Sequence, residues 1–349
     1  MVRRIRPMAI AVALWLACAS HTAEARYRYG QYATGSGEGG VFAYLEGLLS
    51  NPRNADAVVA TEEAFEDFGG GENTLTPIVP QWSDELAGRL GVGYGWAGGS
   101  KVVFTVWGFQ TDQSSSGDGP PGGFTHFAVG PPIRTGGGFV GDQGSPGSWR
   151  MTTEIEAGTA DLAYGHEHAL AEEFVLEWSA GVRYARYEEV MNGSYDEAAS
   201  TDGAFGANSY RAAKSNEGEM FGVRGGLRGS YRFAESFSLD AGLGLSFLDG
   251  ELRASSSLVP DGSANAATTA SSLSEITDDS RSGSVRDLDL AVTWRLTGDA
   301  VRVWLGWEQQ VWEGITTDSV RNFPGTSAPL RDRDSVTISG YKLGVFVRF

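Results

Sequence analysis

The chain has 349 residues, of which 41% are hydrophobic and 11% aromatic, and its 27 basic and 44 acidic side chains give a formal net charge of −17 at pH 7. This acidic balance disfavours a nucleic acid as a partner, and 10 Trp with 17 Phe exclude an intrinsically disordered chain. Beyond the N-terminal segment, no run of apolar residues approaches the roughly 18 that a membrane-spanning helix needs. If the chain spans a membrane, it must therefore do so as a closed β-barrel.

The N-terminal segment has the pattern of a secretory signal peptide. Three arginines, at positions 3, 4 and 6, precede an apolar run over residues 8–20, and Ala23, Glu24 and Ala25 fit a small-x-small cleavage site. The apolar run is too short to remain as a transmembrane helix. We therefore expect a signal peptide over residues 1–25 and export of the rest of the chain.

Alternation of apolar and polar residues predicts the strands of the exported part. A membrane strand has about ten residues, with one apolar and one polar face, and the segment 174–189 is the clearest example, since Phe174, Leu176 and Trp178 share a face opposite Glu177. In chain order, segments with this pattern cover residues 41–49, 85–96, 102–110, 151–164, 174–189, 220–233, 237–247, 287–296, 301–308 and 336–349. The alternation is weaker in the first four, so eight or twelve strands remain alternatives to ten.

The connections between these segments alternate in length. The short ones cover residues 97–100, 165–173, 234–235 and 298–300, and the long ones cover 50–82, 111–149, 191–215, 254–283 and 315–334. Outer-membrane barrels have short periplasmic turns and long extracellular loops. The sequence therefore predicts an all-β, transmembrane, antiparallel up-and-down barrel over residues 40–349, preceded by a short periplasmic segment over 26–39.

Two further features favour an outer-membrane location. Aromatic residues gather at the short-turn ends of the strands, as expected at a membrane boundary; they are Tyr94, Trp96, Tyr164, Phe174, Tyr231, Phe233, Phe237 and Trp294. The chain ends on an alternating strand that resembles the C-terminal signature recognised by the barrel-assembly machinery, with one face made of Tyr341, Leu343, Val345, Val347 and Phe349. We expect outer-membrane lipids, lipopolysaccharide and the assembly machinery as partners.

The polar faces of the strands predict the lining of a narrow lumen. The candidate pore-lining residues are Glu46, Glu85, Arg89, Glu154, Glu156, Glu177, Arg183, Arg224, Arg228, Arg232, Asp287, Asp289, Arg295, Arg302, Glu308 and Lys342. Because acidic and basic strands are neighbours, we expect a cross-strand ion-pair network. The network either selects ions or only fills and rigidifies the lumen. The loop over 111–148, rich in Gly and Pro, either constricts the barrel mouth or caps a partner surface.

No set of residues in the sequence predicts catalysis. His166 and His168 flank Glu167 in an expected turn, and only Asp161 offers a third ligand for a metal. His126 and Asp142 are too little for a catalytic dyad. We therefore expect no enzyme activity, no metal and no cofactor.

Several segments resemble the Legionella-type major outer-membrane-protein family of pore-forming barrels. They are "WSAGVRYARYEEV" (178–190), "FGVRGGLRGSYRFAESFSLDAGLGLSFLDGEL" (221–252) and "VWLGWEQQVWEG" (303–314), with "VFAYLEGLLSNP" (41–52) and "GYKLGVFVRF" (340–349) in the same order. The resemblance implies a porin-like protein that lets small hydrophilic solutes or ions diffuse through its lumen. The alternatives are a closed structural or adhesin-type barrel that acts through its extracellular loops and, less favoured, an outer-membrane hydrolase.

Overall fold

The computed structural model describes ten stretches of the chain. These are residues 39–53, 60–64, 74–78, 84–118, 124–127, 147–197, 208–260, 273–296, 300–314 and 335–349. The expected signal peptide and all but the last residue of the expected periplasmic segment lie outside them. In the part of the chain that the structure describes, no helix is long and apolar enough to cross a membrane.

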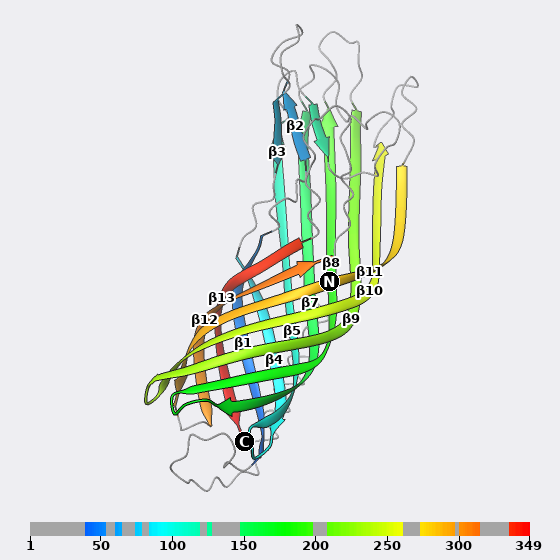
Figure 1. Ribbon diagram of the computed structural model, residues 1–349. Helices are drawn as coiled ribbons and strands as arrows, with labels where there is room; N and C mark the ends of the chain where they lie inside the picture. The colour runs from blue at the N-terminus through cyan, green and yellow to red at the C-terminus, as the bar shows by residue number, and fades with distance from the viewer. Residues whose placement is uncertain are drawn as a thin grey trace.

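Ten strands form one closed antiparallel barrel, as the alternation predicted (Figure 1). In barrel order they are β1 (Gly40–Arg53), β13 (Ser335–Arg348), β12 (Val301–Glu313), β11 (Leu273–Arg295), β10 (Phe237–Pro260), β9 (Asn208–Ala234), β8 (Phe174–Glu197), β7 (Gly147–Ala169), β5 (Ser100–Asp118) and β4 (Glu85–Gly95). The last strand closes the barrel against the first, with Leu45 opposite Val345 and Glu46 opposite Gly344. The C-terminal alternation therefore belongs to the closing strand.

Short and long connections lie at opposite ends of the barrel, which we call the short-turn end and the long-loop end. The turn between β4 and β5 is tight, because Trp96 N donates to Ser100 O at 2.8 Å while Gly98 and Gly99 have φ values of 103° and 82°. Few residues other than glycine adopt that region. Both chain ends of the barrel, Gly40 and Phe349, lie at this short-turn end.

Strands β7 to β11 are longer than a membrane needs. They contain 23 to 27 residues each, against about ten for a membrane crossing, and they rise well above the rest of the barrel (Figure 1). They include residues that the sequence had assigned to the long loops, such as 191–197 and 208–215. The predicted boundaries of these loops were therefore wrong, because polar Ser- and Ala-rich segments continue the strand ladder.

A small second sheet lies at the long-loop end (Figure 1). Its strand order is β3 (Thr74–Ile78), β2 (Ala60–Ala64) and β6 (Phe124–Phe127). It therefore joins two of the predicted long loops, 50–82 and 111–148, by backbone pairing. Most of the second loop lies outside the described residues, so its role as a constriction or a cap stays a prediction.

The outward face of the barrel carries an apolar band. Leu45, Leu243 and Leu343 are 57%, 62% and 58% exposed. The aromatic residues predicted at the short-turn end lie on this face, and a second belt is formed by Tyr184, Phe221, Phe247 and Tyr341. From Phe237 in the first belt to Phe247 in the second, a tilted strand climbs about 25 Å, the height of a membrane band. The fold is a transmembrane barrel.

Candidate functional site: the barrel lumen

Inside the band, ten charged side chains from eight strands form a layer that we call the ionic layer. Its members are Glu46, Arg89, Asp161, Arg183, Arg224, Arg228, Asp287, Asp289, Glu308 and Lys342. Five are acidic and five are basic, so the layer has no net charge. Nine of the ten, all except Asp161, were predicted to line the lumen in an ion-pair network, and the structure places all nine in ion pairs with other members of the layer.

One half of the ionic layer joins the closing strands. Arg89 on β4 bridges Glu46 on β1 at 2.6 Å and Glu308 on β12 at 2.5 Å. Lys342 on β13, 1% exposed, lies 2.5 Å from Asp289 on β11 and 3.7 Å from both glutamates. Each buried cation thus has several carboxylates, which is the condition for burying charge without a large penalty.

A tryptophan also holds Glu46 in place. Trp304 Nε1 on β12 donates to Glu46 Oε1 at 2.8 Å. The indole lies flat against Gly344 of β13, where a Cβ would meet the ring at 2.3 Å. Glycine at position 344 therefore lets the Trp304 indole on β12 pass over β13 and reach Glu46 on β1. The sequence pattern did not indicate this contact.

The other half of the ionic layer centres on Arg183 of β8. Arg183 binds Asp161 of β7 with two hydrogen bonds, of 2.7 and 2.9 Å, and its Nη1 lies 3.0 Å from Asp287 of β11. Arg224 of β9 contacts the same two aspartates at 2.9 and 3.4 Å. Two guanidinium groups and two carboxylates thus form a closed square in which every charge has two partners. Asp161 was missed as a lumen residue in the sequence.

The remaining predicted lumen residues also lie on inward positions, apart from two. Glu177 contacts Lys101 at 2.7 Å near the short-turn end, where Lys101 also reaches Glu167 at 3.1 Å. The Arg302 guanidinium lies 5.1 Å above the ring of Phe346. Glu85, Arg232 and Arg295 occupy inward positions on β4, β9 and β11.

The prediction that Glu154 and Glu156 point inward is wrong. They are exposed on the same face of β7 as Leu162 and Tyr164, and Glu154 accepts a hydrogen bond from Gln110 at 2.8 Å on the outside of the barrel. Their neighbours Ile155 and Ala157, which are 0% and 2% exposed, point inward instead. This part of β7 lies beyond the apolar band, where water surrounds the wall and no longer requires an apolar outward face.

A second layer, which we call the apolar layer, fills the lumen on the long-loop side of the ionic layer. It takes side chains from all ten barrel strands, each 0–3% exposed: Leu48, Ala87, Trp107, Phe109, Ile155, Ala157, Ala185, Tyr187, Met220, Leu248, Val285, Trp312, Val336 and Ile338. On β1, for example, Glu46 belongs to the ionic layer and Leu48 to the apolar layer. The sequence had predicted only polar residues along the lumen.

The apolar layer crosses the barrel from wall to wall. Trp107 on β5 and Trp312 on β12 are four strands apart around the barrel, yet their ring centroids lie 6.0 Å apart. Trp107 also stacks on Phe109 at 6.4 Å. Because the inward side chains of every strand are buried, the layer resembles the packed core of a soluble domain and closes the lumen at this level.

The histidine pair near the short-turn end does not form a metal site with Asp161. His166 and His168 lie on the outward face of β7, with ring centroids 4.4 Å apart, whereas Asp161 points inward to Arg183. Ser100 Oγ lies 3.0 Å from His166 Nδ1, and Trp178 Nε1 donates to His168 Nε2 at 3.3 Å. No group of three metal-ligating side chains exists among the residues described. The side chain of His126 lies outside what the structure describes.

Comparisons with known proteins return barrels but no family. No protein-family model matches the chain, and no curated protein does. Among solved structures, the chain is similar to the outer membrane protease OmpT from Escherichia coli, with 12% identity, 89% of this chain and 97% of the other covered, and a TM-score of 0.45. It is also similar to the TodX deltaS2S3 mutant monoaromatic hydrocarbon channel, with 7% identity, 90% and 91% covered, and a TM-score of 0.24.

These likenesses do not bear on what the chain does, since identities and TM-scores are low for both. The resemblance to the Legionella-type major outer-membrane-protein family also stays a prediction, because no comparison tests it. The function must therefore be argued from the lumen and from the outer surface of the barrel.

Proposed function

We propose that the chain is an outer-membrane barrel with a closed lumen, which acts through the surface that its long-loop end presents outside the cell. This corresponds to the closed-barrel alternative drawn from the sequence. The single observation that carries the proposal is the apolar layer, to which all ten strands contribute side chains that are 0–3% exposed. Hydrophilic solutes do not pass through packed apolar side chains.

The ionic layer supports the same proposal. A selectivity filter presents charges to passing ions, whereas Arg183 and Lys342 are 3% and 1% exposed and have two or three carboxylates each. With five charges of each sign, the layer offers no excess charge to attract a cation or an anion. Its arrangement suits a structural role, in which ion pairs brace the wall from inside.

The tall strands give this barrel its external surface. Strands β7 to β11 contain 23 to 27 residues and rise high at the long-loop end (Figure 1), and a membrane crossing does not require that length. In the proposed orientation they carry the long-loop end away from the membrane. The second candidate function is a porin that lets small solutes diffuse through the lumen. It requires Trp107, Tyr187 and Trp312 to move aside.

Planar-bilayer conductance tests the proposal. The purified, folded and heat-modifiable chain should give no discrete conductance steps under conditions in which a known porin gives them. A Trp107→Ala/Trp312→Ala variant removes the two rings that meet across the lumen, and it should begin to conduct. Replacing the outward Trp307 by Ala is the matched control and should stay silent.

Steps from the unmodified chain would contradict the closed lumen and favour passive diffusion. In that case a salt gradient would separate cation from anion preference. Charge removal at Arg228, the most exposed member of the ionic layer, should then shift the reversal potential. Silence of the unmodified chain with steps from the double variant is the result we expect.

A further inference from the structure

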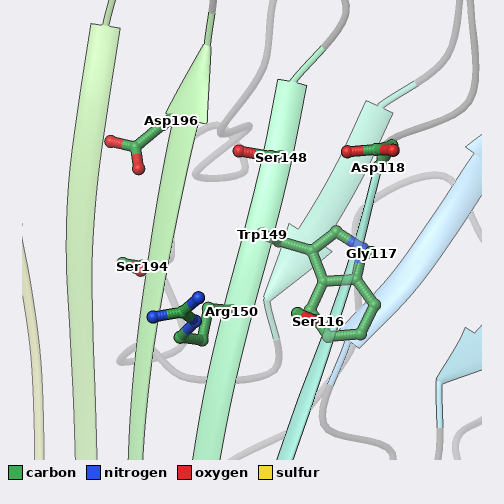
Figure 2. A pocket seen from close by; sticks show the side chains of 8 residues that line it. All are labelled: Ser116, Gly117, Asp118, Ser148, Trp149, Arg150, Ser194 and Asp196. Carbon is green, nitrogen blue, oxygen red and sulfur yellow. The ribbon is translucent and has the colours of Figure 1, made fainter.

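A pocket of about 540 Å³ lies near the long-loop end of β5, β7 and β8, beyond the apolar band. Its lining residues are Ser116, Gly117, Asp118, Ser148, Trp149, Arg150, Ser194 and Asp196 (Figure 2). The volume falls in the range of about 300–1,000 Å³ that is typical of small-molecule sites. Most such sites are lined by apolar groups, whereas hydroxyl and charged groups dominate here.

The strand register places six of these side chains in two rows on the outward face. Asp118, Ser148 and Asp196 lie directly opposite one another across β5, β7 and β8. Ser116, Arg150 and Ser194 form the next row, two residues nearer the membrane. The rows are about 7 Å apart along the strands, and the outer strands are about 10 Å apart. This area matches one or two sugar rings.

The charged groups of the pocket are not used by the protein itself. Among the residues described, Asp118, Arg150 and Asp196 make no hydrogen bond or ion pair, although Arg150 lies diagonally between the two aspartates. Trp149 borders the pocket without pointing into it, because its side chain, 7% exposed, lies on the same inward face of β7 as Met151 and Ile155 and packs against Gly117. Asp118, Arg150 and Asp196 are therefore the charged groups that a ligand in the pocket would meet.

The arrangement of charges excludes several kinds of ligand. Two carboxylates about 10 Å apart cannot chelate one metal ion. A phosphate or sulfate would meet two aspartates beside the one arginine, and a polycation would meet Arg150 between the aspartates. A neutral molecule that both donates and accepts hydrogen bonds fits all three groups, because its hydroxyls can donate to carboxylates and accept from the guanidinium.

We propose that this pocket binds a neutral saccharide of one or two sugar units, with Asp118 and Asp196 accepting hydrogen bonds from sugar hydroxyls and Arg150 donating to sugar oxygens. The inference rests on the proposed function in one respect: the long-loop end must face the exterior, where surface glycans occur. The proposal gives the class of ligand that the long-loop end would bind outside the cell.

A glycan array tests the proposal, probed with the folded full chain in detergent. The array carries neutral, amino-bearing, sulfated and phosphorylated mono- and disaccharides. We expect binding to neutral members, followed by titration of the strongest one. Asp118→Asn/Asp196→Asn and Arg150→Gln should each weaken binding about 10- to 100-fold, as expected for charge-assisted hydrogen bonds. Asp112→Asn, on the same face of β5 but outside the pocket, should not change it.

The other outcomes overturn the proposal. Absence of glycan binding, or binding that the pocket variants leave unchanged, would show that the pocket is not a saccharide site. Binding restricted to sulfated or phosphorylated glycans and sensitive only to Arg150→Gln would indicate an anion site. Heat modifiability of each variant confirms folding. A failure here leaves the conductance result untouched, so it is distinguishable from failure of the closed-barrel proposal.

Discussion

Two regions of the same barrel wall have opposite polarity. Within the apolar band, β8 places Val182 outward, 37% exposed, and buries Arg183 in the lumen. A few residues farther along the same strand, Tyr187 is buried in the lumen at 1% exposure, while Arg186 and Glu188 point outward and form an ion pair at 2.9 Å. The strand does not change its alternation between these points; only the chemistry of the two faces is exchanged.

The exchange follows from the surroundings of each region. Within the band, lipid surrounds the wall and requires apolar side chains on its outward face. The inner face can then hold charges that pair with one another. Beyond the band, water surrounds the wall, and the inner face packs like the core of a soluble barrel. The molecule thus combines a membrane barrel and a water-soluble barrel on one set of strands, with the apolar layer at their junction.

The largest expected effect comes from placing a charge in the apolar layer. Ile155→Asp removes a fully buried side chain and leaves an unpaired carboxylate, so we expect a loss of more than about 5 kcal/mol, enough to prevent folding. Glu154→Leu, at the adjacent outward position, should change stability by less than about 0.5 kcal/mol. Heat modifiability and urea unfolding in lipid vesicles measure both. Equal effects would contradict the exchange of polarity.

The two arginines of β8 test the difference between the wall inside the apolar band and the wall beyond it with charged side chains. Arg183→Ala should cost about 3–5 kcal/mol, because Asp161 and Asp287 lose a buried partner. Arg186→Ala, on the exposed outward face, should cost about 1 kcal/mol or less. Urea midpoints of the refolded variants provide the measurement.

A double variant separates the cost of unpaired charge from the value of the ion pair. Asp161→Leu combined with Arg183→Leu removes one charge of each sign and leaves Arg224 with Asp287, which lie 3.4 Å apart. We expect it to be more stable than Arg183→Ala alone. If it is less stable, the network contributes net stability of its own.

Two variants on β10 would locate the edge of the membrane on the barrel wall. Leu243→Arg places a charge on the lipid face between the two aromatic belts, and such charges cost about 2–4 kcal/mol at the bilayer midplane. Glu251→Arg lies on the same face beyond the second belt and should cost about 1 kcal/mol or less. Unfolding in vesicles, compared with unfolding in detergent, tests whether the difference depends on lipid. A similar cost at both positions would place the boundary elsewhere.

The sequence predicted the strands of the band because lipid imposes a strict rule on one face. Segments such as 174–189 and 237–247 alternate cleanly, and all ten predicted strands exist. The same rule produced the error at Glu154 and Glu156, because it was applied beyond the band. There, Glu154 and Glu156 were taken for lumen residues, although the inward side chain between them is that of Ile155.

The apolar layer could not be predicted from any one strand. Leu48 follows Glu46 on the inward face, and a single apolar residue in a polar row carries no signal. The layer emerges only when the register brings one or two such residues from every strand to the same height. Asp161 was likewise missed, because its face on β7 could be assigned only after Leu162 and Tyr164 were placed outward. The closed lumen thus depends on the register between the strands, which no single strand reveals.

The last prediction concerns the end of the chain, where a small effect on stability is expected. Phe349 is 40% exposed on the lipid face, and its backbone N–H donates to Val41 O at 2.9 Å, a bond that a side-chain change leaves intact. Phe349→Ala should therefore cost about 1 kcal/mol. If the C-terminal residues are an assembly signal, the same variant should strongly reduce the amount of heat-modifiable barrel in outer membranes.

The control is an aromatic residue of the same strand that faces the lumen. Phe346 stacks on Phe42 at 5.3 Å and lies under Arg302, so Phe346→Ala should lower the unfolding free energy more than Phe349→Ala and still assemble in cells. The two variants thus separate folding from recognition. Normal assembly of Phe349→Ala would show that the final aromatic residue serves only the closing strand, where its ring packs against lipid like the other outward side chains of the band.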